Sequence, residues 1–155
     1  MDKGHNDDSG DALRRARAAV DALYAQDAAS QGLGIEVFEV APGRVCTAMT
    51  VRADMVNGHG ICHGGVLFTL ADSAFAFACN SRGDPMVAAG ASIEFLAPAH
   101  RDDRLTARAT ETSRSGRHGI YDVVITGPSG AEIAHFRGRC ARLRVAQAST
   151  TQGPT

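Results

Sequence analysis

The spacing of hydrophobic positions changes along the chain and predicts a series of helices and strands. From residue 11 to about residue 28, apolar side chains recur at helical intervals, which predicts an amphipathic helix lying on the surface. From residue 35 to residue 51 they alternate with polar ones on both sides of a turn at residues 41–43, which predicts two half-buried strands. Strand-like segments return at about residues 86–98, 104–113, 119–127 and 131–145, with a turn at residues 127–130.

The segment between these two groups of strands, from Gly64 to Cys79, is apolar on nearly every helical face. This pattern is typical of a helix surrounded by protein. We expect the helix to begin at residues 63–65 and to end at residues 80–83, where Asn, Ser and Gly offer a C-terminal cap. The order of elements predicts an α+β fold in which an antiparallel sheet curls around the buried helix.

Both ends of the chain contain little that could pack, so we expect disordered tails at residues 1–9 and 146–155 around a single domain at residues 10–145. A formal net charge of -1 leaves no overall positive field, and we expect neither nucleic-acid nor membrane binding. The longest apolar run is interrupted and shorter than the ~20 residues of a spanning helix. The N-terminus lacks the features of a secretory signal, which favours the cytoplasm and free thiols on the four cysteines.

Asp72 is the most informative single residue because it is the one carboxylate inside the long apolar run. Burying an ionised carboxylate costs several kcal/mol unless it is paired or hydrogen-bonded. Such a residue is a candidate catalyst. The alternative is a carboxylate that forms a structural hydrogen bond to a neighbouring strand.

Several short motifs around this helix resemble one protein family. They are Asn57 followed by His63-Gly-Gly65, a carboxylate nine positions after the histidine, and the segments at residues 78–81, 93–98, 119–122 and 136–138. Together they resemble the hotdog-fold acyl-CoA thioesterases, and among these the PaaI type of phenylacetate degradation, over roughly residues 30–145. The resemblance implies a sheet wrapped around one long buried helix and hydrolysis of aryl-acyl-CoA thioesters, typically (hydroxy)phenylacetyl-CoA.

The family resemblance also implies a homodimer, commonly paired into a homotetramer. Coenzyme A would enter as part of the substrate and leave as product, so no cofactor is expected. His59, Cys62 and His63 match no closed zinc pattern, and we expect no metal site.

Gly64 and Gly65 suit the polarisation of a thioester carbonyl. Free backbone N–H groups at a helix N-terminus can bind the developing oxyanion, and the absence of Cβ atoms lets an acyl group approach. The alternative is that these glycines only ease the entry into the helix. Asp72, for which the resemblance favours catalysis, would act as nucleophile or as general base.

Distance along the helix adds a constraint on this site. Eight residues separate Gly64 from Asp72, which corresponds to about 12 Å, too far for both to contact one carbonyl. If two chains pair with their buried helices antiparallel, Asp72 of one chain can face Gly64 of the other. The sequence therefore leads to the hypothesis of an active site divided between two subunits.

Two further residues near the helix start have candidate roles. Asn57 resembles a position where related enzymes hold a polar amide near the thioester or the water, although an Asn in a glycine-rich turn can instead adopt a left-handed conformation. His63 is expected either to orient the loop through a backbone hydrogen bond or to contact the substrate. Several relatives carry Ser or Thr near positions that here are Ala76 and Ala88, so water positioning would depend on Asn57 or on the backbone.

The phosphates of coenzyme A require a local basic group, for which the turn from Arg114 through Gly116 and Arg117 to His118 is a candidate. Arg101, Arg137 and Arg139 are rivals, and any single arginine can be plain surface charge.

Two other functions stay open at this point. A hotdog hydratase or dehydratase would pair its acid with a histidine, but none occurs between Asp72 and Pro98. An acyl-CoA-binding regulatory module would normally carry a DNA-binding domain, for which residues 1–30 supply a single predicted helix.

Overall fold

The computed structural model describes residues 5–144, with side chains from residue 8 onward. Its elements, in chain order, are two helices, two strands, one long helix and four more strands. They are α1 (His5–Tyr24), α2 (Ala28–Gly32), β1 (Glu36–Ala41), β2 (Arg44–Thr50), α3 (Gly64–Asn80), β3 (Met86–Phe95), β4 (Arg104–Ser115), β5 (His118–Thr126) and β6 (Glu132–Arg142). A short 3-10 helix at Ala53–Met55 lies between β2 and α3.

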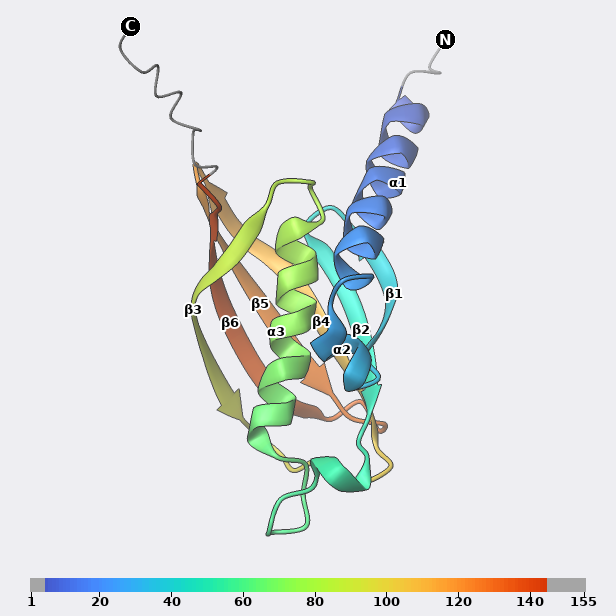
Figure 1. Ribbon diagram of the computed structural model, residues 1–155, viewed down its shortest axis with the longest axis vertical. Coiled ribbons are helices and arrows are strands. Elements are labelled where there is room, and N and C mark those ends of the chain that lie inside the picture. The colour runs from blue at the N-terminus through green and yellow to red at the C-terminus, as the bar shows by residue number, and fades with distance from the viewer. Residues whose placement is uncertain (1–4, 145–155) are drawn as a thin grey trace, which may run out of the picture.

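The six strands form one antiparallel sheet in the order β1-β2-β4-β5-β6-β3. The sheet curls around α3, and α1 lies beside α3 near the β1 edge (Figure 1). The predicted α+β arrangement is therefore confirmed, as are the hairpin turn before β2 and the turn at residues 127–130. None of the helices in the described part of the chain has the length and apolar character needed to cross a bilayer.

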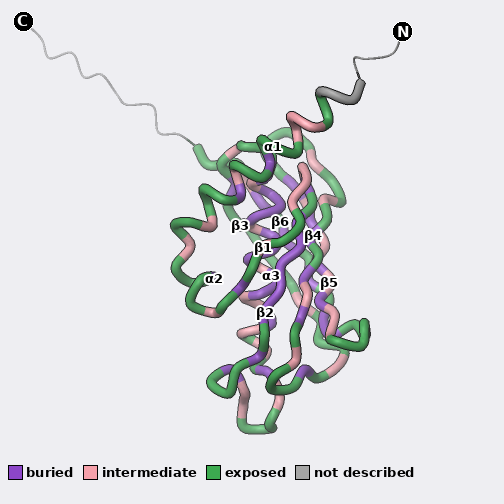
Figure 2. The backbone as a smooth tube through the Cα atoms, turned by 90° about the vertical axis from the view of Figure 1, so that its right-hand side faces the viewer, coloured by how far each residue is buried: buried purple, intermediate pink, exposed green. Residues whose placement is uncertain are grey.

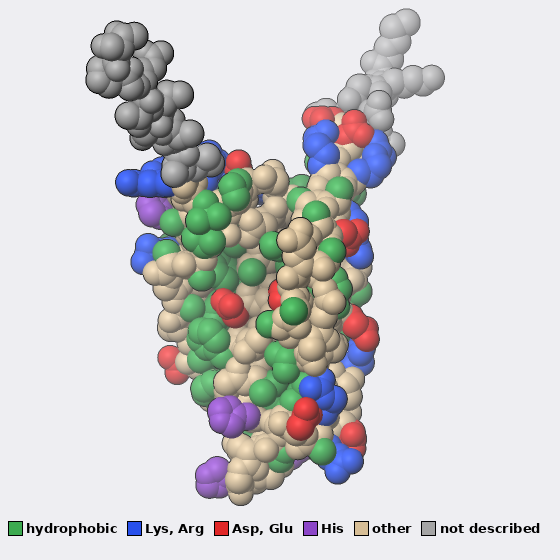
Figure 3. Space-filling model, in the orientation of Figure 1, with side chains coloured by type: hydrophobic (Ala, Val, Ile, Leu, Met, Phe, Trp, Pro, Cys, Tyr) green, Lys and Arg blue, Asp and Glu red, His purple; other side chains and the backbone are tan. Residues whose placement is uncertain are grey.

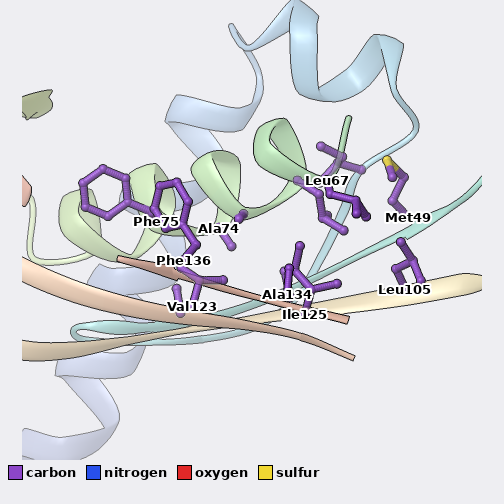
Figure 4. Packing of buried hydrophobic residues seen from close by; sticks show 14 of the residues in the cluster. Met49, Leu67, Ala74, Phe75, Leu105, Val123, Ile125, Ala134 and Phe136 are labelled. Atoms are coloured by element: carbon purple, nitrogen blue, oxygen red, sulfur yellow. The ribbon is translucent and has the colours of Figure 1, made fainter. Parts of the chain in front are cut away.

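The core lies between α3 and the concave face of the sheet. Figure 4 shows Leu67, Ala74 and Phe75 of α3 directed toward Val123 and Phe136 of the strands. Figure 2 shows that the buried residues follow α3 and the strands behind it, whereas the connecting loops are exposed. A side chain at Gly138 would begin only 2.8 Å from the Phe75 ring, so this glycine lets the aromatic ring pack directly on β6. This packing fixes the height of α3 over the sheet.

Polar side chains at the end of α3 connect it to neighbouring elements, as expected for its C-terminal cap. The Asn80 side-chain amide donates to the carbonyl oxygens of Ala76 (2.9 Å) and Met86 (3.0 Å), and its oxygen accepts from the Met86 N–H. The Ser81 hydroxyl donates to Ala78 and accepts from the Gly43 N–H. Because these bonds reach β3 and the β1–β2 turn, they fix α3 along its own axis.

The N-terminal region differs from the sequence prediction in three ways. The first helix, predicted to extend to about residue 28, ends at Tyr24. Helix α1 begins at His5, so residues 5–9, expected as a tail, are helical; extending a helix already packed by its later turns costs little. The second helix, α2, was not predicted, because its five residues are too few to show an apolar period. A local N-cap at Asp27 and a buried hydrogen bond between Ser30 and Ser73 hold it in place. At five residues it is too short to complete a DNA-binding helix pair with α1. The predicted tail at residues 146–155 lies outside the described residues.

The prediction that α3 is surrounded by protein does not hold for one stripe of the helix. This stripe, which runs through Gly65, Thr69, Asp72 and Ala76, is only partly covered by the described residues. The neighbouring strand β3 is exposed over most of its length. Figure 3 shows hydrophobic side chains gathered on the face where β3 and α3 lie. A hydrophobic pattern indicates which surface must be covered, but it does not indicate which chain covers it.

Candidate active site

The start of α3 presents one free backbone amide. His63 is the N-cap residue: its Nδ1 atom accepts a hydrogen bond from the Gly65 N–H at 2.9 Å, and its own N–H donates to the Met55 carbonyl at 2.8 Å. The Gly65 amide is therefore not free, contrary to the expectation. The Gly64 N–H has no acceptor within the described chain and remains available for an oxyanion.

This arrangement is consistent with the first of the two roles considered for His63, orientation of the loop. Because Nδ1 accepts a hydrogen bond, the ring proton of the neutral form lies on Nε2. The hydrogen bonds of His63 to Gly65 and Met55 hold the loop and the first helical turn in place, as expected if His63 orients the loop.

A cleft of about 520 Å³ opens beside the Gly64 amide. Asn57 and Gly64 lie on its border, and Leu67, Phe95 and Pro98 contribute an apolar wall. A Cβ atom on Gly64 would stand 3.0 Å from the Phe95 ring, so a side chain there would displace that ring. The glycine is therefore required for access as well as for helix entry. Phe95 lies in this wall with 54% of its surface exposed.

Asn57 closes the loop in front of the cleft. Its Oδ1 atom accepts from the N–H groups of His59 (2.9 Å) and Ile61 (3.4 Å), and its own N–H donates to the Ile61 carbonyl. Asn57 is not left-handed, because Asp102 is the one non-glycine residue with positive φ in the described chain. With Oδ1 engaged, the amide nitrogen Nδ2 finds no acceptor in residues 5–144. It can therefore donate to a molecule in the cleft.

Asp72 lies two turns further along α3 and is half-buried. No hydrogen bond or ion pair reaches its carboxylate from the described residues, so the alternative of a structural bond to a strand is not observed. Burial raises the pKa of Asp72, and the negative charge of Asp27 raises that pKa further. A carboxylate with a raised pKa is a better base and nucleophile once ionised.

The basic turn lies at the other end of α3. Arg114 forms an ion pair with Asp84, which follows α3 in the chain and also accepts from Arg142 at 2.8 Å. Because α3 has 17 residues, this end is about 24 Å from Gly64 along the helix. Within one chain, the structure brings Asn57, His63 and Gly64 together, but not Asp72 or the turn at residues 114–118.

The arginines of this region differ in how far their charge is neutralised. Arg117 donates to the Arg142 carbonyl at 3.1 Å, and Arg139 donates to the Ala89 carbonyl at 3.0 Å. In the described chain neither is paired with a carboxylate, whereas Arg137 forms two hydrogen bonds to Asp122. Arg117 is therefore a better anion ligand than Arg114.

His59, Cys62 and His63 lie in the loop before α3. No three His, Cys, Asp or Glu residues are placed to share an ion within the part of the chain that the structure describes. Burial raises the pKa of the Cys62 thiol to about 11, which disfavours the thiolate that a metal would need. No histidine contacts Asp72 there either, as a hydratase of this fold would require.

Sequence reasoning missed Asp27, which was not considered at all. The signal for Asp27 was the local pattern of an Asp three residues before Ser30, which is typical of a helix N-cap. Its effect on Asp72 depends on packing and could not be recognised from that pattern.

The chain can now be compared with known proteins. The sequence model of the thioesterase superfamily matches residues 59–134. The acyl-coenzyme A thioesterase PaaI of Escherichia coli (strain K12) is 43% identical over 122 residues, which cover 79% of this chain and 87% of PaaI. The structure of the E. coli PaaI protein from the phenylacetic acid degradation operon superposes with a TM-score of 0.84 and 41% identity, covering 86% of this chain and 96% of that one.

A more distant solved structure contains coenzyme A. A hypothetical thioesterase protein from Streptococcus pneumoniae TIGR4, solved with coenzyme A, is 27% identical with a TM-score of 0.68 and covers 70% of this chain and 85% of that one. The arrangement of sheet and central helix, the motifs around α3 and these similarities agree. The chain therefore belongs to the thioesterase superfamily, as an acyl-CoA thioesterase of the PaaI type with the hotdog fold.

Proposed function

We propose that this thioesterase hydrolyses aryl-acyl-CoA thioesters, with (hydroxy)phenylacetyl-CoA as the favoured substrate. The observation that carries the proposal is the half-buried Asp72 carboxylate, which has no hydrogen-bond or ion-pair partner among the described residues. The apolar cleft beside the Gly64 amide is compatible with an aromatic acyl group, since Phe95 and Leu67 line it. The similar PaaI protein of E. coli comes from an operon for phenylacetic acid degradation, which supports the same substrate class.

The active form is a homodimer in which two β3 strands and two α3 helices face each other, and two dimers pair into a tetramer. Strand β3 is an edge strand, so one side of its backbone has no neighbouring strand in the sheet. Its middle consists of small residues at positions 88–92, which allow another strand to approach closely. Covering this edge also covers the open stripe of α3.

A two-fold axis near Phe68, midway between Gly64 and Asp72, makes the two α3 helices antiparallel and places Asp72 opposite the partner's Gly64. Each dimer then has two equivalent sites. The same pairing brings the C-terminal end of one α3, with Arg117 near it, toward the cleft of the other subunit. Asp72 and Arg117, which lie far from the Gly64 cleft of their own chain, thereby come close to the cleft of the partner.

In this site the thioester carbonyl accepts a hydrogen bond from the Gly64 N–H, and the helix N-terminus stabilises the negative charge that develops on its oxygen. The partner's Asp72 either attacks the carbonyl carbon or removes a proton from the attacking water. In the first route a mixed anhydride forms, coenzyme A leaves as thiolate, and water then hydrolyses the anhydride. Asn57 donates from Nδ2 to the thioester or to the water, while His63 maintains the first helical turn.

Arg117 and the backbone N–H groups of its turn, at Gly116 and His118, bind the phosphates of coenzyme A. Replacing Arg117 by Ala is expected to raise KM for the CoA ester about tenfold and to leave kcat nearly unchanged, because the phosphates do not react. Arg137→Ala is the matched control, since Asp122 already neutralises that guanidinium. A fall in kcat at constant KM for Arg117→Ala would remove this residue from the phosphate site.

A panel of acyl-CoA esters tests the substrate class. We expect kcat/KM to be highest for phenylacetyl-CoA and its ring-hydroxylated forms, and at least tenfold lower for straight-chain esters, because a flexible chain fills the apolar cleft less well. Asp72→Ala serves as the control for enzyme-catalysed hydrolysis. Higher kcat/KM for straight-chain esters would overturn the proposed specificity. Binding without turnover would favour a regulatory module.

A further inference from the structure

A chain of hydrogen bonds connects α2 to the residue next to Asp72. The Asp27 carboxylate caps α2, accepting from the Ser30 N–H at 2.9 Å and from the Ser30 hydroxyl at 2.6 Å. The Ser30 and Ser73 hydroxyl oxygens lie 2.8 Å apart. Ser30 is 1% exposed and Ser73 is 7% exposed, so the link is shielded from water. Ser73 directly follows Asp72 on α3.

The chemistry of these groups fixes the direction of each bond. An ionised carboxylate only accepts, so the Ser30 hydroxyl must donate its single proton to Asp27. The Ser30 oxygen is then the acceptor, and Ser73 is the donor. A serine inside a helix often bonds back to a carbonyl of its own helix, whereas Ser73 is directed outward to α2. The bond therefore fixes the rotation of α3 about its axis at the level of Asp72.

Asp27 also acts on Asp72 through its charge. Besides burial, the charge of Asp27 is the cause that raises the pKa of Asp72. The thiol of Cys79, which also couples to Asp72, is neutral because burial raises its pKa.

The remaining elements packed against α3 bring no charge close to Asp72. Strands β2 and β3 present uncharged side chains to the helix in the described chain. The other ionisable groups facing α3 are either neutral or engaged elsewhere. They are Tyr24 of α1, bonded to the Ile35 carbonyl; Glu111 of β4 and Tyr121 of β5, bonded to each other; and the Cys140 thiol of β6.

We propose that Asp27 is a positioning residue for the thioesterase reaction, holding Asp72 in place through the buried hydrogen bonds of Ser30 and Ser73. The inference rests on the proposed function, in which Asp72 is the catalytic carboxylate. Asp27 does not touch the substrate. It orients the helix that carries Asp72 and, by like-charge repulsion, makes the ionised Asp72 a stronger base.

The test compares pH profiles of kcat/KM for wild type, Asp27→Asn and Asp21→Asn with an aryl-CoA ester. Asn caps a helix about as well as Asp, so Asp27→Asn keeps α2. It removes the charge, and its amide nitrogen donates to the Ser30 hydroxyl, which reverses that one hydrogen bond. For Asp27→Asn we expect the acidic limb of the kcat/KM profile to move to lower pH. Its kcat at neutral pH should fall about two- to fivefold, with KM unchanged. Asp21→Asn removes an exposed charge that is paired with Arg17, and its profile should coincide with wild type.

Ser30→Ala is the second variant, because it interrupts the hydrogen-bond chain but keeps the Asp27 charge. It should lower kcat severalfold without moving the acidic limb. If Asp27→Asn leaves the limb in place, or if a folded Ser30→Ala keeps wild-type kcat, the inference is wrong. Asp72→Asn separates this failure from that of the proposed function: an active Asp72→Asn variant would disprove the catalytic role itself, whereas an inactive one alongside unchanged Asp27 variants would disprove only the positioning role.

Discussion

Replacing Asp72 by Asn is expected to lower kcat for acyl-CoA hydrolysis by about 10³-fold and to leave the fold intact. The amide has nearly the same shape as the carboxylate but is a poor nucleophile and base. Since no described residue bonds to the carboxylate, the folded chain loses no hydrogen bond on substitution. Steady-state hydrolysis of an aryl-CoA ester, with Asp21→Asn as a matched exposed-acid control, measures the effect.

The same variant has a predicted effect on stability, with a sign that follows from the raised pKa of Asp72. An acid whose pKa is higher in the folded than in the unfolded state binds protons more tightly when folded. Its ionisation at neutral pH therefore destabilises the fold, and this penalty disappears as the pH falls through the unfolded-state pKa. We expect Asp72→Asn to have an equal or higher Tm than wild type at pH 7, with the difference shrinking in acid.

Two results would contradict this interpretation. Hydrolysis within tenfold of wild type would exclude Asp72 as catalyst. A Tm several degrees below that of wild type at neutral pH would mean that the carboxylate forms a stabilising bond in the assembled protein, which is the structural role considered for it at the outset.

Purified heterodimers of Asp72→Asn and Gly64→Val chains are expected to recover about half the activity of wild-type dimers, although each parent alone is nearly inactive. In a divided site, one of the two sites in such a heterodimer combines an intact Asp72 with an intact Gly64 from the partner. The other site carries both changes. Gly64→Val blocks its site because even a Cβ atom there meets the Phe95 ring at 3.0 Å.

Co-expression of the two chains with different affinity tags, followed by sequential purification, gives the heterodimers. Wild-type chains bearing the same two tags are the matched control. If Asp72 and Gly64 acted within one chain, every site of the heterodimer would contain one change, and no activity would return. That outcome, in verified heterodimers, would exclude the antiparallel pairing of α3 helices.

The boundaries of α3 were predictable because short-range features mark them. Gly64 follows a histidine N-cap, and Asn80 and Ser81 bond within and just beyond the last turn. The strands were predictable for a similar reason, since alternation of apolar and polar side chains reflects which face meets the core. The start of α1 was misplaced because residues 5–10 carry no apolar period in the sequence, whereas a helix that is already formed extends at little cost.

Other features of the site depend on contacts between distant residues. Arg114 was a candidate phosphate ligand, but Asp84, 30 positions earlier, neutralises it. Helix α2 is held in part by the bond that joins Ser30 to Ser73, 43 positions apart. A local sequence pattern cannot indicate which residues 30 or more positions apart will form a hydrogen bond or an ion pair.

The sequence by itself determined the α+β class, the extent of the central helix and the residue types at its start, because periodicity, capping and turn chemistry act over a few neighbouring positions. Only the tertiary structure decided that, among the described residues, the Gly64 amide is free while that of Gly65 is bonded to His63 and Asp72 has no hydrogen-bond partner, and that Asp27 acts on Asp72. These facts depend on where atoms lie to within a few tenths of an ångström, and hydrogen bonds and charges are sensitive to that scale whereas hydrophobic patterning is not.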